Sequence, residues 1–231
     1  MFIDRVVAPY FATNCWLIAA EARGECVIVD PGIADPNLVG PIRAKLNEHH
    51  LKAVALLITH GHLDHTFSVA PLQEDAGISN IFIHRKDRDL LAEPKLAMGP
   101  EGLALFAELS GSLGGSLREP TGIVELGESE QLQIAGMEMN FIATPGHTPG
   151  SITIIINDEV AVTGDTLFAG SIGRTDLPRG SISDMQTTLR EKIATLPGHL
   201  RVLPGHGKET RMEKELSNNP FLLAAIEGGL A

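Results

Sequence analysis

Residues 59–65 read Thr-His-Gly-His-Leu-Asp-His, and this stretch carries the strongest signal in the chain. The run before it, 53–59, is short and apolar, which is typical of a strand covered on both faces. Such a strand, ending in a turn that Gly61 permits, aims side chains into one cleft. Imidazole and carboxylate together suit zinc, or iron and manganese at similar geometry. We favour a metal site over solvated loop residues, with four candidate ligands: His60, His62, Asp64 and His65.

Three more polar residues follow predicted strands in the same way. His147 lies in Thr-Pro-Gly-His-Thr-Pro-Gly (144–150), Asp165 in Thr-Gly-Asp-Thr (163–166) and His206 in Pro-Gly-His-Gly (204–207). Taken singly, a Gly-His turn is more often structural, and an Asp after a strand is usually a helix cap. Because all three share one arrangement, a strand followed by a polar residue beside glycine, we expect them to join the first four.

The remaining pattern alternates strands and helices in both halves of the chain. Short apolar runs predict strands, and apolar residues at helical spacing predict helices. In the helix 183–196 we expect Ser183 as the N-cap and Gly198 just past the end. Two packed sheets with helices outside, an αβ/βα sandwich of the α/β (α+β) class, account for this order. The expected strands are 26–30, 53–59, 81–83, 137–143, 151–157, 160–163 and 200–203, and the expected helices are 36–50, 67–76 and 183–196.

One segment departs from this alternation, residues 85–120. It contains Pro94, Pro100 and several glycines, with one helical stretch at 103–109. Because globular patterning resumes after it, we interpret it as a lid-like insertion in a single domain spanning 1–231. A short helical tail is expected from Glu213 onward.

Composition excludes several functions. The net charge of -11, with no run of Lys or Arg, disfavours nucleic acid and anionic membrane as partners. The first residues lack the apolar core of a signal peptide, and no segment approaches the ~18 apolar residues of a membrane span. Cys15 and Cys26 fit two reduced structural thiols in a cytoplasmic protein. The expected partner is a small molecule, and the oligomeric state is left open.

The chain resembles the metallo-β-lactamase superfamily over nearly its whole length. The resemblance runs from Asn14, through the Val-Ile-Val-Asp-Pro-Gly of 27–32, to the Pro-Gly-His-Gly of 204–207. Within it, the chain looks like the compact bacterial branch of glyoxalase II-like (hydroxyacylglutathione hydrolase-like) enzymes. The resemblance implies a four-layer αβ/βα fold and two divalent metal ions, zinc before iron or manganese. It also implies one ion held by His60, His62 and His147, a second held by Asp64, His65 and His206, and a bridge at Asp165. The Asp at 165, where true β-lactamases have Cys, points away from them.

Two metal ions lower the pKa of a shared water, so that a metal-bound hydroxide can attack a carbonyl carbon near neutral pH. Asp64 and Asp165 are the expected catalytic carboxylates, because they hold metal charge and orient the nucleophile. A thiolate leaves without a strong acid, since its pKa is ~8.5. Thioesters or activated esters are therefore the expected substrates.

Three residues outside the ligand set carry open alternatives. Asp30 either orients a ligand imidazole or simply forms the turn before Pro31. Arg174 and Asp176 either line the mouth of the substrate site or form a structural ion pair. The glutathione-specific enzymes have Lys and Tyr in that loop and a longer basic C-terminal domain, so we expect poor recognition of glutathione here.

Other activities fit the same scaffold. A persulfide dioxygenase would bind one iron through His60, His147 and Asp165, and it shares the Gly-Arg-Thr-Asp of 173–176. The Pro-Gly-His-Gly of 204–207 favours the hydrolase instead. A lactonase is the other alternative, because the motif at 60–65 does not separate lactones from thioesters.

Overall fold

A computed structural model describes residues 1–100, 102–104, 106–107 and 118–230 of the protein. The first half forms a six-stranded sheet in the order β1-β2-β3-β4-β5-β6. Its first three strands pair antiparallel, and β3 to β6 pair in parallel. The strands are β1 (Phe2–Val7), β2 (Asn14–Ala19), β3 (Glu25–Val29), β4 (Lys52–Leu57), β5 (Asn80–His84) and β6 (Ile123–Leu126).

The second half forms another six-stranded sheet, in the order β12-β11-β10-β9-β8-β7. All of its pairs are antiparallel except β10 with β11, which are parallel. The three strands β8, β10 and β11 therefore run in one direction and end at one edge of the sheet. The strands are β7 (Ser129–Ile134), β8 (Met137–Ala143), β9 (Ile152–Ile156), β10 (Val160–Gly164), β11 (Arg201–Pro204) and β12 (Thr210–Arg211).

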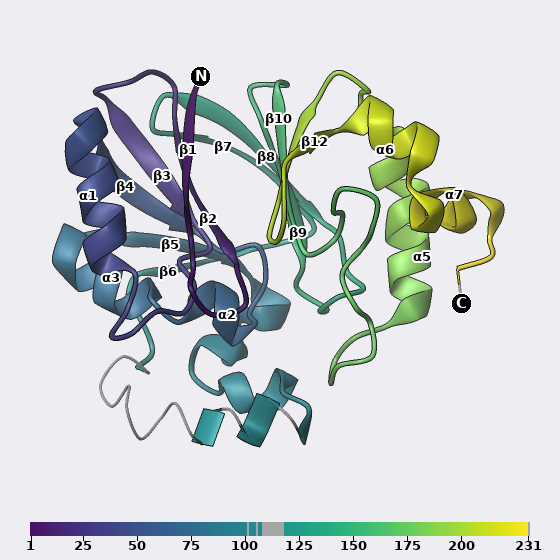
Figure 1. The fold of residues 1–231 in the computed structure, drawn as a ribbon, viewed down its shortest axis with the longest axis horizontal. Helices are drawn as coiled ribbons and strands as arrows, with labels where there is room; N and C mark the ends of the chain where they lie inside the picture. Colours follow the sequence, from purple (N-terminus) through teal and green to yellow (C-terminus); the bar gives the residue numbers. More distant parts are fainter. Residues whose placement is uncertain (101, 105, 108–117, 231) are drawn as a thin grey trace.

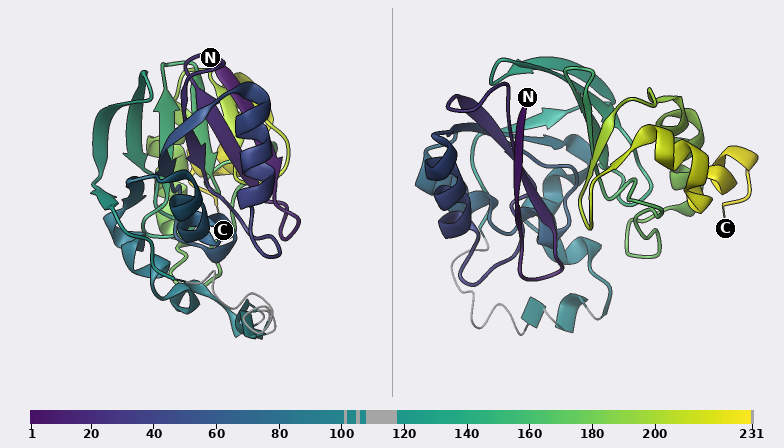
Figure 2. Two further views of the ribbon diagram at one scale, coloured as in Figure 1. Left: turned by 90° about the vertical axis from the view of Figure 1, so that its left-hand side faces the viewer. Right: turned by 45° about the horizontal axis from the view of Figure 1, so that its top comes forward.

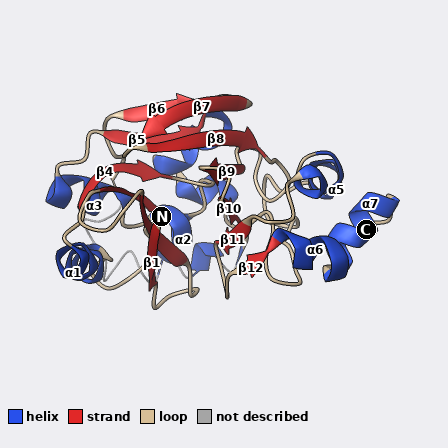
Figure 3. Ribbon diagram, turned by 90° about the horizontal axis from the view of Figure 1, so that it is seen from above, coloured by secondary structure: helices blue, strands red, loops and turns tan. Residues whose placement is uncertain are grey.

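Helices cover the outer face of each sheet. In Figure 1, α1 (Val39–His49) and α3 (Val69–Ala76) lie on the left, and α5 (Ile182–Glu191), α6 (Met212–Asn218) and α7 (Pro220–Glu227) lie on the right. Viewed from above, the strands fill the space between the two sets of helices (Figure 3). The predicted four-layer αβ/βα sandwich is thus confirmed. The short elements are α2 (Leu63–Thr66), η1 (Arg85–Leu91), η2 (Pro94–Ala97) and η3 (Ile193–Thr195).

The alternation of side chains along the strands explains the layers. In β2, Trp16 and Ile18 join the core between the two sheets, while Cys15 and Leu17 join the core under α1 and α3. A third core lies under α5 to α7 on the outer face of the second sheet. Every residue of β2 is buried, because both faces of the strand are covered. Cys15 and Cys26 are both buried and free, as predicted.

Several boundaries differ from the prediction. Five strands were not predicted. The sequences of β1, β2, β6 and β7 mix charged or polar residues with apolar ones, and β12 has only two residues. The predicted N-cap Ser183 is wrong: Ser181 caps α5, and its hydroxyl accepts a hydrogen bond from the amide of Asp184. The predicted helix 183–196 ends early, at Glu191, and one turn of 3-10 helix, η3, follows.

The segment 85–120 begins with η1 and η2, and residues 102–104 and 106–107 are helical. These parts lie at the lower end of the molecule in both panels of Figure 2. The rest of the predicted helix at 103–109, and Gly111, Gly114 and Gly115, lie outside the described residues. The role of the segment as a lid stays a prediction. The helical tail is confirmed as α6 and α7. Within the described residues, no helix has the length and apolar character of a membrane span.

Candidate metal centre

The predicted ligands converge because the strands before them end at a shared edge. His60 follows β4, while His147, Asp165 and His206 follow β8, β10 and β11. Backbone hydrogen bonds join the two sheets at this edge: the amide of Ile152 donates to the carbonyl of Thr59 over 2.9 Å, and that of Asn14 donates to Gly205 over 2.7 Å. Each ligand loop therefore starts from a fixed strand end.

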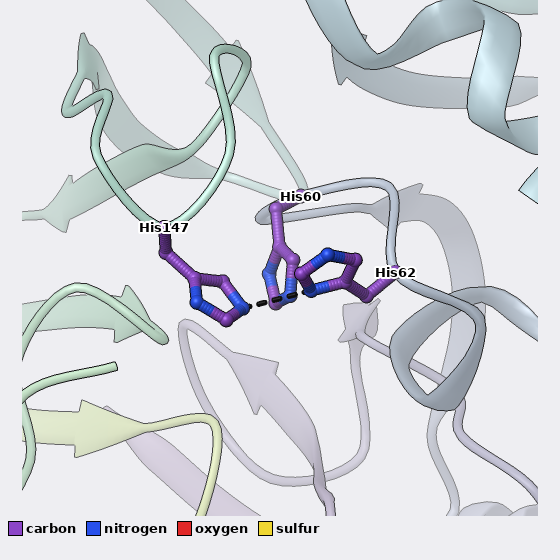
Figure 4. Close-up of side chains that lie close together, drawn as sticks. All are labelled: His60, His62 and His147. Atoms are coloured by element: carbon purple, nitrogen blue, oxygen red, sulfur yellow. Dashed lines mark hydrogen bonds between the residues drawn. The ribbon is translucent and has the colours of Figure 1, made fainter. Parts of the chain in front are cut away.

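His60, His62 and His147 form the first cluster, which we call the three-histidine group. Their ring centroids lie 4.5 to 4.9 Å apart, and their planes are nearly perpendicular. Figure 4 shows the rings turned toward one another, with Nδ1 of His62 2.8 Å from Nε2 of His147. All three side chains are buried. One ligand atom from each lies within 4.8 Å of the others, so the group can hold a single ion.

Asp64, His65 and His206 form a second cluster, which we call the acidic group. Nε2 of His65 lies 3.2 Å from Nε2 of His206, and Oδ2 of Asp64 lies 3.4 Å from each of these nitrogens. A tetrahedral zinc site with Zn–N of 2.0–2.1 Å separates its ligand atoms by ~3.3 Å. The acidic group therefore already has the spacing that coordination requires.

Asp165 lies between the two clusters. Its Oδ1 is 3.4 Å from Nε2 of His65, and its Oδ2 is 3.4 Å from Nε2 of His206 and 3.5 Å from Nε2 of His147. The glycine of Pro-Gly-His-Gly explains how this close approach is possible. A Cβ at Gly205 would lie within 2.7 Å of both the Asp165 carboxylate and the His65 ring, so a larger residue would push the two apart.

The bonding of these residues fits a metal ion. Within the described part of the chain, Nε2 of His60, Nε2 of His62 and Oδ1 of Asp165 are buried and have no hydrogen-bond partner. Buried polar atoms in native proteins are nearly always paired, so three orphan acceptors in one place mark a space for a cation. Imidazole nitrogens and carboxylate oxygens suit a divalent transition metal. The residues present therefore fit a divalent ion.

The pKa values differ between the two clusters. Burial, together with the neighbouring histidines, lowers the pKa of His60 well below its usual value and that of His62 to about 3. Burial also disfavours the charged form of His65, but Asp64, Asp165 and Asp30 outweigh it and raise its pKa to about 9. The same balance, with Asp165 and Asp64 as partners, raises the pKa of His206 to about 10. Without metal, His65 and His206 are therefore protonated at neutral pH, and their positive charge faces the carboxylates in place of a metal ion.

Asp30 contacts two residues of the ligand motif at 59–65, Thr59 and His65. It lies after β3, and its Oδ2 is 3.0 Å from Nδ1 of His65. The carboxylate also accepts hydrogen bonds from the amide and the hydroxyl of Thr59, over 2.8 and 2.6 Å. Of the two alternatives for Asp30, orientation of an imidazole therefore matches its contacts.

Arg174 and Asp176 form an ion pair with each other, with two contacts of 2.7 and 2.8 Å between exposed side chains. This is the structural alternative for the pair. The backbone of the loop, however, reaches the centre, because the carbonyl of Arg174 lies 2.7 Å from Nδ1 of His147. Gly173 passes so close to the Asp165 carbonyl that a Cβ there would collide with it.

Other contacts were not predicted from the sequence. The hydroxyl of Thr13 donates to Oδ2 of Asp64 over 3.2 Å, and the carbonyl of Phe11 lies 3.0 Å from Nδ1 of His206. No local motif marks this loop between β1 and β2. The buried carboxylate of Asp87 was also missed, although it follows strand β5 as the ligands follow theirs. It lacks the neighbouring glycine that marks the ligand turns, so the pattern used for the ligands does not include it.

Known proteins are similar to this chain in sequence and in fold. A family model described as the metallo-beta-lactamase superfamily matches residues 8–206. The hydroxyacylglutathione hydrolase GloC of Haemophilus influenzae is 33% identical, over 96% of this chain and 98% of its own length. The probable metallo-hydrolase YqgX of Bacillus subtilis is 33% identical, over 94% of each chain. The crystal structure of the BLEG-1 B3 metallo-beta-lactamase is 30% identical, with a TM-score of 0.78 over 96% of this chain and 99% of that one.

The sequence match, the two packed sheets and the histidine and aspartate clusters at their shared edge agree with one another. The chain belongs to the metallo-beta-lactamase superfamily.

Proposed function

We propose that this protein is a metal-dependent hydrolase that cleaves thioester or ester bonds with two divalent ions, similar to glyoxalase II. The three-histidine group would hold one ion and the acidic group the other, with Asp165 serving both. The position of Asp165 carries this proposal, because its carboxylate lies 3.4 to 3.5 Å from donors in each group. Zinc is the expected metal, with iron or manganese as the alternatives, since all three accept nitrogen and oxygen ligands.

When bound, such ions lower the pKa of water and polarise a carbonyl or phosphoryl oxygen. The protein's own residues prepare the site for this chemistry. Asp64 and Asp165 supply the negative charge, and their oxygens can orient an attacking water by accepting its hydrogen bond. Asp30 and the Arg174 carbonyl hold the rings of His65 and His147 through the nitrogens that face away from the centre.

The substrate approaches from the side of the acidic group. The side chains of His206 and Asp64 are 26% and 21% exposed, whereas that of His147 is 4% exposed and His60 and His62 are buried. A scissile carbonyl can therefore approach Asp64 and His206 from solvent. A thiolate with a pKa of ~8.5 departs without a strong general acid, so thioesters match a site whose polar residues are ligands. The similarity to GloC, which is named as a hydroxyacylglutathione hydrolase, favours the same bond type.

The similarity to BLEG-1 supports a second candidate, opening of a β-lactam ring. That reaction also begins with attack on a carbonyl carbon, and the amine that leaves stays tethered in the product. We rank it second because an amine is a poorer leaving group than a thiolate and needs a proton.

Thiol release tests the proposal. The zinc-loaded protein is incubated without oxygen with a series of acyl thioesters, and the free thiol is detected with a chromogenic reagent. In parallel, opening of a chromogenic cephalosporin and oxygen uptake with glutathione persulfide are recorded. The proposal expects thiol release that is lost in Asp165→Asn and kept in Asp176→Asn. Oxygen uptake with persulfide by an iron-loaded protein, with no thiol release, would overturn it in favour of a dioxygenase.

A further inference from the structure

Asp87 is a fully buried carboxylate in η1, outside the ligand set. Taking a carboxylate out of water is costly unless it is hydrogen-bonded. It accepts three hydrogen bonds: from the amide of Gly61 over 2.8 Å, from the hydroxyl of Thr148 over 2.6 Å, and from the amide of Gly150 over 2.9 Å. The first donor lies between His60 and His62, and the other two follow His147. Each of these donors therefore belongs to a loop of the three-histidine group.

The backbone is shaped for these contacts. A Cβ at Gly150 would lie 2.5 Å from Cγ of Asp87, and a Cβ at Gly61 would lie 2.6 Å from Leu90 and 3.0 Å from the Asp87 carbonyl. Both glycines therefore let a ligand loop approach η1 more closely than a larger residue would. One side chain thus spans two loops that are far apart in the sequence, and it contacts them behind the rings rather than in the centre.

We propose that Asp87 is a positioning residue. It fixes the loop of His60 and His62 relative to the loop of His147, so that the three-histidine group can bind its metal ion. This inference rests on the proposed function, since it takes the group to be a metal site. The acidic group has its own supports, Asp30 and Thr13, and none of its residues is bonded to Asp87 in the contacts above. Loss of Asp87 therefore weakens metal binding at one group and not at the other.

Asp87→Asn tests this selectively. Asparagine has nearly the same shape, but its amide NH2 cannot accept a hydrogen bond and faces a donor in either orientation. Two backgrounds separate the groups: His206→Ala leaves the three-histidine group as the complete site, and His147→Ala leaves the acidic group. Zinc alone is the probe, titrated against a chromophoric chelator into metal-free protein. Outer partners of metal ligands typically change affinity by 10- to 100-fold, so we expect about a tenfold loss in the His206→Ala background and under about twofold in the His147→Ala background.

Glu215 offers a matched control. It is also buried and also accepts three hydrogen bonds, from Thr210, Gly170 and Asn219, none of which is a ligand or lies in the two loops. Glu215→Gln should lower the unfolding temperature as Asp87→Asn does, because both leave buried donors unpaired. It should leave zinc affinity unchanged in both backgrounds. A purely structural role for Asp87 predicts that the two variants behave alike.

Variants of Thr148, whose hydroxyl donates to Asp87, give a second test if Asp87→Asn does not fold. Thr148→Val removes the hydroxyl at nearly constant volume, and Thr148→Ser keeps it, so only the valine variant should lose zinc affinity in the His206→Ala background. Equal losses in both backgrounds, or no loss in either, would overturn the role of Asp87. A wild-type protein that binds no zinc would instead overturn the metal centre itself, and this inference with it.

Discussion

Replacing Asp165 by asparagine should remove most metal binding and most activity while the fold survives. Its Oδ2 lies 3.4 Å from His206 and 3.5 Å from His147, and its Oδ1 lies 3.4 Å from His65. Asparagine keeps the shape and one acceptor oxygen, so the change is mainly the loss of one negative charge. That charge attracts protonated His206 in the metal-free protein, and it would attract a metal ion bound at the same place.

The size of the effect follows from Coulomb's law. Two unit charges 3.4 Å apart attract by about 5 kcal/mol at an effective dielectric constant of about 20. The remaining amide oxygen and solvent near the partly exposed His206 recover part of this, so we take about 3 kcal/mol. Since 1.4 kcal/mol is a factor of ten, zinc affinity should fall by roughly 100-fold.

The assay is a zinc titration of metal-free protein against a chromophoric chelator, with thioester turnover measured on the same samples. Asp176→Asn is the control, because it removes a carboxylate from the loop that follows Asp165 but breaks only the exposed pair with Arg174. The control should bind zinc like the wild type. An Asp165→Asn protein with full zinc affinity and full turnover would refute the bridging role.

Three further outcomes are expected. S-lactoylglutathione should be cleaved with weak saturation, because helices α6 and α7 offer one cation, Lys214, to the glutathione carboxylates. Arg174 is expected to substitute for the missing cations in part, so Arg174→Ala should raise KM further; a micromolar KM that this change leaves intact would contradict the expectation. Metal binding to the acidic group should release protons below about pH 9, since the raised pKa values of His65 and His206 keep both protonated there without metal. Metal affinity should therefore fall as pH falls. Calorimetry in buffers of different ionisation enthalpy measures the protons released, and a result of no release would contradict this expectation. Cys26, whose pKa burial raises to about 12, should react with thiol reagents only after denaturation, and rapid labelling of the folded protein would contradict its burial.

The convergence of the candidate ligands could be predicted from the sequence because its signal is local. Each of the seven candidate ligands follows a strand that is apolar enough to be recognised alone, and the structure brings all seven to one edge. The layer order followed from the same strands. The edge strands were harder: β7 alternates exposed and half-buried residues, and β1 is nowhere fully buried, so neither has a strongly apolar run.

What the sequence did not reveal depends on contacts between distant segments. Arg174 was considered for its side chain, yet it is its backbone carbonyl that reaches His147. Asp87 was missed because it lies in a segment interpreted as an insertion, and nothing local shows that it bonds to Gly61 and Gly150. Ser183 was predicted as the N-cap, but it lies inside α5, and the hydroxyl of Ser181 accepts the hydrogen bond from the amide of Asp184.

Metal content per chain tests the central claim most directly. The protein is loaded with zinc, freed of excess and analysed for metal, alongside His147→Ala and His206→Ala. The two-metal account predicts two zinc ions in the wild type and one in each variant, since each substitution disables a different group. A single metal ion per chain, with a count that His206→Ala leaves unchanged, would contradict it, because a mononuclear site of His60, His147 and Asp165 does not use His206.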